Sequence, residues 1–522
     1  MLFNSYIFVL LFLPIALAGW YALNKLNKCK LALAFLTVMS LWFYGYFNVK
    51  YLFIIVFSML GNYIISGFMA YIENSGWGRT DKENVTCKKN NENDSVPANI
   101  RIIRRILMIA GVILNLGILF YFKYFDFFIE NINGIFKADF SLHNILMPLG
   151  ISFFTFQQLS YIIDRGWGKA DHYEFLDYAA FVTFFPQLVA GPIVLHSELV
   201  PQFHNSNKQF DSQMFYDGLV SFVLGLSKKV LLADTLAVVA DYGFSNALYL
   251  DTFSTICVMV AYSLELYFDF SGYSDMAIGL GYMFGITLPV NFNSPYKSHS
   301  LKDLWGRWHI TLTRFMTTYV YIPLGGNRKG RARTLINVFI VFLLSGLWHG
   351  AAWTYIVWGA LTGIIVVWDN LGIVGFDANE KHPAKIVLPK WLGIVFTNIA
   401  FTMLLIPFRS PNLSTAAQMC RNFTKGWTGN LLKLADATMD YSEIYIIDLI
   451  IRKSFPQYLQ ISRVIIMLLL LALGVFTVTR KNVAEILVTY RKRRFLGICV
   501  AVLLVYCIVS FSQVGTFIYF NF

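Results

Sequence analysis

Charged side chains are scarce in this chain of 522 residues. Asp, Glu, Lys and Arg make up 14% of the sequence, whereas a soluble domain carries about 25%. Hydrophobic residues reach 57%, and aromatic residues alone reach 17%. This balance excludes an ordinary soluble domain and indicates a membrane protein.

Cysteine is also sparse. The six cysteines are scattered along the chain, at positions 29, 87, 257, 420, 499 and 507. They form no C-x-x-C pair, so their spacing predicts neither a disulfide framework nor a metal site. No carboxylate at H-x-x-x-H-type spacing accompanies His309 or His349, and we expect no bound metal and no bound cofactor.

Basic residues are missing ahead of the first apolar run, although Ala16-Leu17-Ala18 resembles a cleavage site. Because signal peptides carry a basic n-region, we interpret this run as a retained membrane span.

Several apolar runs approach the roughly 20 residues that a membrane-spanning helix needs. The clearest are Ile7–Leu23, Leu31–Phe47, Tyr51–Ile72, Ile102–Phe125, Val464–Val478 and Phe495–Phe511. The sequence therefore predicts an all-α polytopic integral membrane protein with about ten to twelve spans.

The net charge of +12 reports topology rather than nucleic-acid binding. Lys and Arg cluster in short loops, at Lys25–Lys30, Arg79–Arg105, Arg328–Arg333, Arg480–Lys481 and Arg491–Arg494. Short basic loops stay cytoplasmic. If these loops are inside, both termini lie outside, as does a segment of about residues 409–462. The same loops favour contact with anionic membrane lipids.

Three regions follow one another along the chain. Residues 1–125 are plain spans with one polar loop, Glu73–Asn99, which we expect to be flexible and to carry no chemistry. Residues 140–370 mix polar side chains, Gly and Pro into the apolar runs. Residues 371–522 return to plain spans around the outside segment. Polar or irregular elements at membrane depth are tolerated only when they are buried or line a wet cavity, so we place the functional core in residues 140–370.

Polar residues interrupt this core at several points. The stretch Pro148–Gly168 contains Gln, Thr, Ser and Asp side chains, and Phe184–Ile193 has two prolines where we expect a broken helix. Glu265, Asp269 and Asp275 lie within one apolar segment. Each would cost about 2.5–3.5 kcal/mol at the bilayer centre, which indicates a polar interior. A structural hydrogen-bond network and a direct role in chemistry both remain open for these carboxylates.

The stretch Ser300–Gly330 shows helical periodicity. Its apolar stripe consists of Leu301, Leu304, Trp305, Trp308, Leu312, Phe315, Met316 and Tyr319. Arg307, Thr311, Arg314 and Thr318 lie on the other side, and His309 flanks the stripe. We predict one amphipathic helix that ends at Pro323 and forms an interface or a cavity wall.

The stretch "LLSGLWHGAAWTYIVWGA", Leu343–Ala360, places His349 among apolar residues. If its helix starts inside near Thr334, His349 lies about 22 Å deep and can be reached from outside through a funnel. Gly350 and the alanines after it allow a close approach or a break. Neutral imidazole is a natural general base near neutral pH, although a satisfied core histidine is the alternative. The other six histidines, at positions 143, 172, 196, 204, 299 and 382, receive no role.

Several motifs in order identify a resemblance. They are "PLGISFFTFQQLSYIID", "FPQLVAGPI", "GLSKKVLLADTLA", "FDFSGYSDMAIGLG", "NFNSPYKSHSLKDLWGRWHITLTRFMTTYVYIPLGGNR" and "SGLWHGAAWTYIVWG". Together they resemble the membrane-bound O-acyltransferase family, in its bacterial branch of alginate O-acetylation and D-alanyl-teichoic-acid proteins. The resemblance is strong over about residues 145–370 and implies spans and re-entrant or interfacial helices around a central tunnel.

The resemblance assigns roles to particular residues. His349 matches the catalytic base, and His309 matches the second histidine of the bacterial branch. Trp305, Arg307 and Trp308 match the tunnel-lining helix, and the predicted tunnel also includes Trp348, Asn293 and Asp269. His309 would orient the donor, stabilise the oxyanion or relay a proton. Arg328 and Lys329 would attract donor phosphates, with topology anchors as the alternative.

The resemblance implies an O-acyltransferase of the bacterial inner membrane. We expect it to move a short acyl group, most simply acetyl, from a cytoplasmic thioester such as acetyl-CoA toward an extracellular or cell-surface polysaccharide, directly or through an extracellular acetyltransferase partner. One alternative is D-alanyl transfer to teichoic acid from a carrier protein. Another is a transporter or flippase of a lipid-linked sugar, which intramembrane carboxylates and a broken helix also fit.

Overall fold

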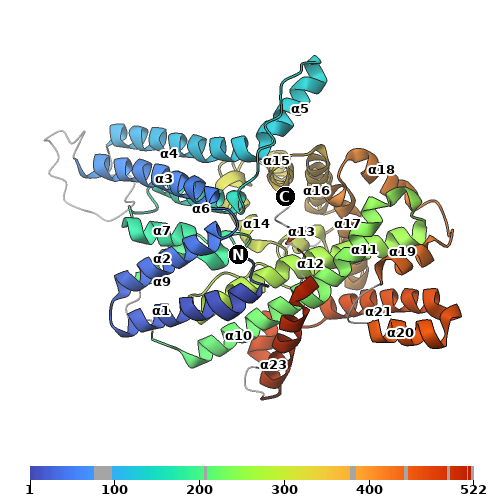
Figure 1. Ribbon diagram of the computed structural model, residues 1–522. Helices are drawn as coiled ribbons and strands as arrows, with labels where there is room; N and C mark the ends of the chain where they lie inside the picture. Colours follow the sequence, from blue (N-terminus) through green and yellow to red (C-terminus); the bar gives the residue numbers. More distant parts are fainter. Residues whose placement is uncertain are drawn as a thin grey trace. The chain divides into compact units, whose positions relative to one another are not determined.

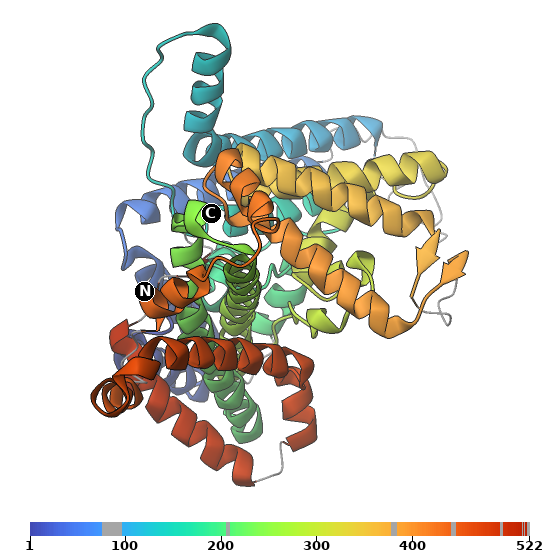
Figure 2. The same ribbon diagram turned by 90° about the vertical axis from the view of Figure 1, so that its right-hand side faces the viewer.

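The chain is almost entirely helical in its computed structural model (Figure 1), which confirms the all-α prediction. The structure describes residues 1–75, 97–204, 209–376, 384–439, 445–490, 494–513, 515 and 517–518. A short parallel pair of strands, β1 (Val374–Gly375) and β2 (Ile386–Val387), is drawn as arrows in Figure 2. Cys87, His382 and most of the Glu73–Asn99 loop lie outside the described residues.

The described helices include eight that are long and apolar enough to cross a membrane. They are Phe8–Lys25, Lys50–Asn74, Ala98–Phe136, Thr252–Met283, Arg331–His349, Trp353–Leu371, Lys390–Arg409 and Pro456–Thr479. Two shorter apolar helices, Cys29–Gly45 and Phe495–Val509, bring the number to ten. The prediction of a multi-pass membrane protein is therefore confirmed.

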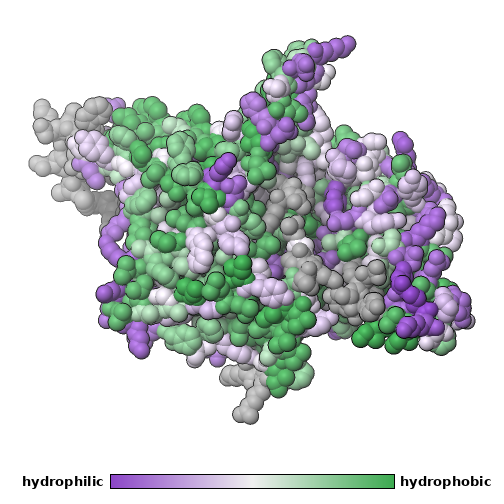
Figure 3. All heavy atoms as spheres, viewed as in Figure 1, coloured by the Kyte–Doolittle hydropathy of each residue, from purple (hydrophilic) through white to green (hydrophobic). Residues whose placement is uncertain are grey.

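The first compact unit comprises residues 1–216 and 280–289. Its elements are η1 (Phe8–Phe12), α1 (Leu13–Lys25), α2 (Cys29–Gly45), α3 (Lys50–Asn74), α4 (Ala98–Leu119), η3 (Phe120–Tyr124), α5 (Phe125–Phe136), α6 (Ile151–Trp167), α7 (Phe175–Thr183), α8 (Phe185–Leu188) and α9 (His196–His204). The surface over α3 and α4 is largely hydrophobic (Figure 3), with Phe53, Phe57 and Ile113 exposed. Such a face suits contact with lipid.

A polar network lies inside this unit, where the sequence places the polar residues of Pro148–Gly168. The amides of Asn62 and Asn115 bond each other at 3.1 and 2.6 Å, and Asn62 also donates to Gln158. These hydrogen bonds satisfy the buried amide groups of the network, and none of them requires a ligand.

The helix break expected in Phe184–Ile193 is present, because α7 ends at Thr183 and the four-residue α8 starts at Phe185.

The second compact unit comprises residues 217–279 and 290–522, so the predicted middle region contributes to both units. Its elements are α10 (Ser212–Ser227), which begins in the first unit, η4 (Lys228–Ala233), α11 (Asp234–Ser245), η5 (Ala247–Tyr249), α12 (Thr252–Met283), whose end belongs to the first unit, η6 (Pro295–Lys297), α13 (Leu301–Trp305), α14 (Ile310–Met316), η7 (Thr317–Tyr321), α15 (Arg331–His349), α16 (Trp353–Leu371), α17 (Lys390–Arg409), α18 (Leu413–Asn422), α19 (Asn430–Thr438), α20 (Tyr445–Ser454), η9 (Pro456–Tyr458), α21 (Leu459–Thr479), α22 (Val483–Tyr490), α23 (Arg494–Val509) and η10 (Ser510–Gln513).

Helix α12 runs through the interior, and 83% of the residues in its most apolar 18-residue stretch are buried. Two of its three carboxylates, Asp269 and Asp275, pair with the consecutive lysines of η4. Lys228 Nζ lies 2.6 Å from Asp275 Oδ2, and Lys229 Nζ lies 2.5 Å from Asp269 Oδ1. The polar interior expected around this segment is therefore present, and each of these buried charges has a partner, as burial demands.

The prediction of one continuous helix over Ser300–Pro323 is wrong. Helix α13 ends at Trp305, the chain turns through residues 306–309, and α14 starts at Ile310. His309 has φ 47° and ψ 50°, in the left-handed region that a non-glycine residue rarely occupies. The apolar spacing continues across the break, so periodicity alone could not reveal it.

Helices α15 and α16 form a close pair on either side of the Gly350-Ala351-Ala352 break. A Cβ on Gly346 would lie 2.4 Å from the Tyr355 carbonyl oxygen, and one on Gly359 would lie 2.6 Å from that of Phe342. Only glycine permits this approach at both points. The pairing places His349 as the last residue of α15.

Asp251 provides a test of how this unit is held together outside its membrane-spanning helices. Its carboxylate accepts bonds from Ser254 N–H at 2.9 Å and from Thr428 N–H at 3.0 Å. Burial raises the pKa of Asp251, but hydrogen bonds from Ser254 and Thr428 outweigh it and leave the pKa below its ordinary value. This stabilisation is present above the unfolded-state pKa, about 3.9, and is lost as pH falls through the folded-state pKa.

We predict that Asp251→Asn lowers the free energy of unfolding by about 1–3 kcal/mol near neutral pH, because a charged acceptor is lost. Thermal unfolding of the detergent-purified protein from about pH 3 to pH 7 measures this, and the difference from wild type shrinks toward the acid end. The matched control is Asp139→Asn at an exposed site. An equal effect of both variants would contradict the prediction.

Candidate active site

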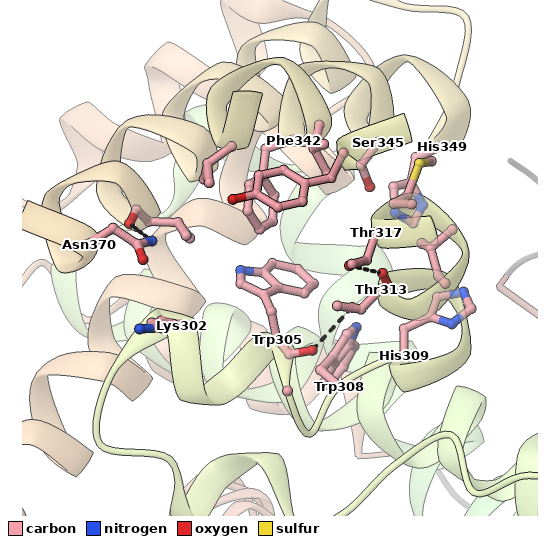
Figure 4. Close-up of a pocket in the computed structure, with 17 residues that line it drawn as sticks. Lys302, Trp305, Trp308, His309, Thr313, Thr317, Phe342, Ser345, His349 and Asn370 are labelled. Carbon is pink, nitrogen blue, oxygen red and sulfur yellow. Dashed lines mark hydrogen bonds between the residues drawn. The ribbon is translucent and has the colours of Figure 1, made fainter. Parts of the chain in front are cut away.

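A cavity of about 310 Å³ brings the two singled-out histidines together in the second unit (Figure 4). It is lined from α13, the break after it, α14, η7, α15 and α16. Both His309 and His349 contribute to the lining, although their positions are forty residues apart in sequence. Most other lining side chains are apolar or aromatic. The exceptions include Lys302, Asn370 and the hydroxyls of Thr313, Thr317 and Ser345.

The break before α14 creates the His309 position. The ring is 1% exposed, lies edge-on to Phe270 at 4.7 Å between ring centroids, and lies 6.0 Å from the Trp348 ring. In a continuous helix the side chain would follow the helical face of its neighbours. The left-handed backbone turns it into the cavity instead, at a cost of about 1–3 kcal/mol that the surroundings must offset.

Asn291 supplies much of that compensation. Its side-chain oxygen accepts three hydrogen bonds, from the backbone N–H of Thr311 (3.2 Å), the hydroxyl of Thr311 (2.9 Å) and His309 Nδ1 (3.2 Å). Its backbone oxygen accepts from Ile310 N–H at 3.0 Å, and Asn293 N–H donates to Arg307 O at 2.9 Å. We call Asn291 and these donors the Asn291 clamp. It fixes both sides of the break at once.

The Asn291 clamp also sets the tautomer of His309. Because the Thr311 backbone N–H can only donate, the Asn291 atom that it meets is the amide oxygen. His309 Nδ1 must therefore carry a proton, and Nε2 has the lone pair in the neutral ring. Burial lowers the pKa of His309, which lies outside the membrane-spanning helices, to about 3, so the ring is neutral. His309 Nε2 is buried and bonds no described residue, and its lone pair is available to accept a hydrogen bond.

His349 lies in an aromatic enclosure at the end of α15. It is 5% exposed, and its ring centroid lies 4.8 Å from Trp348, 5.0 Å from Trp358 and 5.1 Å from Phe408. The chain becomes extended at Gly350, where a Cβ would lie 2.1 Å from the Tyr355 ring. The small residue expected to leave room after His349 therefore makes room for that ring.

Of the three residues predicted to lie on the tunnel-lining helix, two line the cavity and one does not. Trp305 and Trp308 line the cavity, and Trp308 also packs against Phe292. Thr313 donates to the Trp305 carbonyl oxygen across the break at 3.1 Å (Figure 4). Arg307 does not line the cavity, and its Nε donates to Asp303 Oδ1 at 2.8 Å.

The other predicted residues lie around the cavity rather than in its lining. Trp348 contacts His349, and Asn293 accepts a bond from Asn482 at 3.0 Å. Asp269 pairs with Lys229 beside a second cavity. Arg328 and Lys329 are exposed in the turn between η7 and α15.

Asn291 bonds one of the two candidate histidines, and the sequence analysis did not single it out. In "NFN" the prediction took the second asparagine for the tunnel, and the structure places the first against His309. Alternation in an extended segment sends residues two apart to the same side, so this pattern does not distinguish the two asparagines. Which asparagine bonds His309 depends on the turn at His309, and the apolar spacing, which continues at helical period across that turn, does not reveal it.

The sequence of the chain is similar to those of known membrane acyltransferases. Residues 166–405 match the family model of the membrane-bound O-acyltransferase family, MBOAT. The peptidoglycan O-acetyltransferase of Helicobacter pylori is 37% identical over 473 residues, which cover 85% of this chain and 83% of that protein. The probable alginate O-acetylase AlgI of Pseudomonas putida is 40% identical, with coverage of 80% and 79%. The teichoic acid D-alanyltransferase of Bacillus subtilis is 27% identical, with coverage of 50% and 67%.

We predict that Asn291→Asp keeps His309 protonated to a higher pH, because a carboxylate beside Nδ1 favours the charged imidazole. Nitrogen-15 histidine spectra of the purified protein report both the tautomer and the protonation of the ring. Wild type should show a neutral ring with the proton on Nδ1.

The matched control for this substitution is Asn293→Asp, two residues away and without a bond to His309. It should leave the spectrum of His309 unchanged. A wild-type ring with its proton on Nε2 would contradict the role of the Asn291 clamp.

Proposed function

The chain belongs to the membrane-bound O-acyltransferase family and is an O-acyltransferase, and from this premise we propose that it transfers acetyl from a thioester to a hydroxyl of a polysaccharide. The observation that carries the proposal is the shared cavity of His309 and His349, which combines a mostly apolar lining with two imidazole rings. Relatives named for O-acetylation match most of the chain, and those named for D-alanyl transfer match about half of it.

The apolar cavity suits the acyl end of a thioester donor. Its walls are aromatic and aliphatic, which excludes water from the reacting carbonyl and strengthens the electrostatic effects of nearby groups. The exposed Arg328 and Lys329 follow η7, whose residues Thr317 and Tyr321 line the cavity. We take acetyl-CoA as the donor, and these cations would attract its phosphates.

The reaction needs one proton removed and one proton delivered. The acceptor oxygen attacks the thioester carbonyl carbon, the C–O bond forms and the C–S bond breaks. His349 takes the proton of the attacking hydroxyl, and the same proton reaches the departing sulfur to give a free thiol. A positioned general base contributes typically 10²–10⁴-fold to such a step.

The Asn291 clamp narrows the role of His309. A neutral ring with its proton on Nδ1 has no N–H at Nε2, so Nε2 cannot donate a hydrogen bond to a developing oxyanion. Nε2 can accept a hydrogen bond from a hydroxyl. We therefore assign His309 to orientation of the acceptor hydroxyl rather than to oxyanion stabilisation.

The setting of the reaction belongs to the same proposal. The short basic loops support a topology with both termini outside. The bacterial source of the similar O-acetyltransferases supports the bacterial inner membrane. The donor then enters from the cytoplasm and the acceptor from outside. Acetyl reaches the polysaccharide directly or through an extracellular acetyltransferase partner. A transporter of a lipid-linked sugar would not need the two buried histidines that share the cavity, so they favour acyl transfer.

We predict that His349→Ala and His309→Ala each lower acetyl transfer by about 10²-fold or more. The assay follows label from acetyl-CoA into polysaccharide in membrane vesicles. His143→Ala is the matched control, because His143 is exposed and lines neither cavity. Wild-type rates in both variants, with intact folding, would refute the catalytic assignment.

The same vesicles separate the alternatives. Label from D-alanine on its carrier protein in place of acetyl would favour D-alanyl transfer. Movement of a lipid-linked sugar without thioester cleavage would favour transport. The expected result is His349-dependent cleavage of acetyl-CoA and acetyl on a polysaccharide hydroxyl.

A further inference from the structure

The cavity shared by the two histidines has an exposed end and a buried end. Lys302 lines it and is exposed, whereas His309 and His349 are 1% and 5% exposed. Figure 4 shows Lys302 and Asn370 at one end, the histidines at the other and Trp305 between them. A molecule that enters beside Lys302 therefore passes Trp305 before it meets His349.

One face of α15 forms a wall along this path. Its lining residues are Val338, Val341, Phe342, Ser345 and His349. Their spacing follows the helical repeat, so they lie on one side of the helix. Positions 338 and 349 are eleven residues apart, so at 1.5 Å of rise per residue the wall is about 16 Å long.

Helix α16 fixes which end of the wall lies beside Lys302. A Cβ on Gly359 would meet Gly346, and one on Gly363 would meet Phe339, so α16 runs antiparallel to α15. Asn370, at the end of α16, therefore lies near the start of the wall, away from the histidine.

Two cationic residues, Lys302 and Arg331, are attached to this end of α16. The backbone N–H of Lys302 donates to Asp369 Oδ2 at 3.1 Å, and the Arg331 guanidinium bonds the carbonyl oxygen of Leu371. Both cationic side chains are exposed. Arg331 offsets the partial negative charge of the helix C-terminus, and the two cations outnumber the one carboxylate that α16 places there.

The ammonium of Lys302 is not used by the acidic residue next to it. Asp303 Oδ1 lies 2.8 Å from Arg307 Nε, and its Oδ2 lies 3.1 Å from His299 Nδ1. Within the part of the chain that the structure describes, Lys302 forms no ion pair. A lysine at the mouth of a cavity is a suitable ligand for a phosphate group.

Trp305 supplies a hydrogen-bond donor within the cavity. Its Nε1 is buried and bonds no described residue, and Figure 4 shows this nitrogen on the Lys302 side of the ring. Indole N–H can only donate. Because a buried N–H without an acceptor is costly, this position suits an acceptor atom of a bound molecule, such as an amide carbonyl oxygen.

These features match the arm of coenzyme A in order and in length. The arm leads from the sulfur through two amide groups to a phosphate over about thirteen bonds. An extended polypeptide covers 3.3–3.6 Å with every three bonds, so an arm of this kind spans about 15 Å. With the thioester at His349, the first phosphate then reaches the mouth, and an amide carbonyl lies on the way.

We propose that Lys302 binds the first phosphate of the donor arm and that Trp305 Nε1 donates to an amide carbonyl of the arm. The inference rests on the proposed acetyl transfer and adds two residues that determine donor specificity. The group that the cavity selects is the phosphate at the end of the arm, and the length of the wall sets the thioester at His349.

The test compares two donors that differ by one phosphate, S-acetyl-pantetheine and S-acetyl-4′-phosphopantetheine. Label is followed from each donor into polysaccharide in inverted membrane vesicles, and the rate in His349→Ala vesicles is subtracted. Wild type should show a KM for the phosphorylated donor at least about tenfold below that for the other, the size of one charge-assisted contact.

Lys302→Ala should raise the KM for the phosphorylated donor about tenfold and leave that for S-acetyl-pantetheine within about twofold. Lys302→Arg should keep most of the preference, because it keeps the charge. A defect in folding would change both donors alike. Trp305→Phe retains a ring but loses the N–H, and it should raise the KM for both donors about fivefold.

Lys433→Ala is the matched control at an exposed lysine of α19 and should behave as wild type. Equal KM values for the two donors in wild type, or an unchanged preference in Lys302→Ala, would overturn the inference. So would loss of the preference in Lys329→Ala alone, which would assign the phosphate to the turn after η7. Absence of His349-dependent transfer from acetyl-CoA in wild type would instead reject the proposed function itself.

Discussion

The hydrogen bonds of the Asn291 side-chain oxygen hold the part of the molecule on which the candidate site depends. They fix a left-handed histidine between two short helices and join it to the extended segment before them. Without this acceptor, the Thr311 N–H would be buried and unpaired, and the apolar stripe would favour a continuous helix. The strained turn, the tautomer of His309 and the shape of the cavity wall therefore share one cause.

Close helix packing supplies the other half of the site. The glycines of α15 and α16 let these helices approach until one backbone touches the other, and this fixes where α15 ends. His349 then lies among Trp348, Trp358 and Phe408, which exclude water around it. Because His349 lines the cavity that it shares with His309, a substrate bound in that cavity can reach it.

The sequence allowed much of the fold to be predicted, because lipid imposes a simple rule on composition and length. The apolar runs, the interruption near Pro186 and the polar interior around α12 all appear in the structure. The break at His309 did not follow, because Leu, Trp and Phe continue at helical spacing across it. A non-glycine residue in the left-handed region gives no local signal. Asn291 was missed for the same reason, since its partners meet it only after the chain has turned.

For the three carboxylates of α12, the sequence left open a structural network and a direct role in chemistry, and the structure distinguishes the three side chains by their partners. Asp275 and Asp269 face the consecutive lysines of η4, and these pairs account for their burial. The motif "SKKVLLAD" thus contains the counter-charges for α12, and its π-helical turn brings both lysines to the same helix. Glu265 lies one turn before Asp269 and lines the second cavity, and its Oε2 accepts no hydrogen bond from the described residues. Structural pairing therefore explains the burial of Asp269 and Asp275, whereas no ion pair among the described residues accounts for that of Glu265.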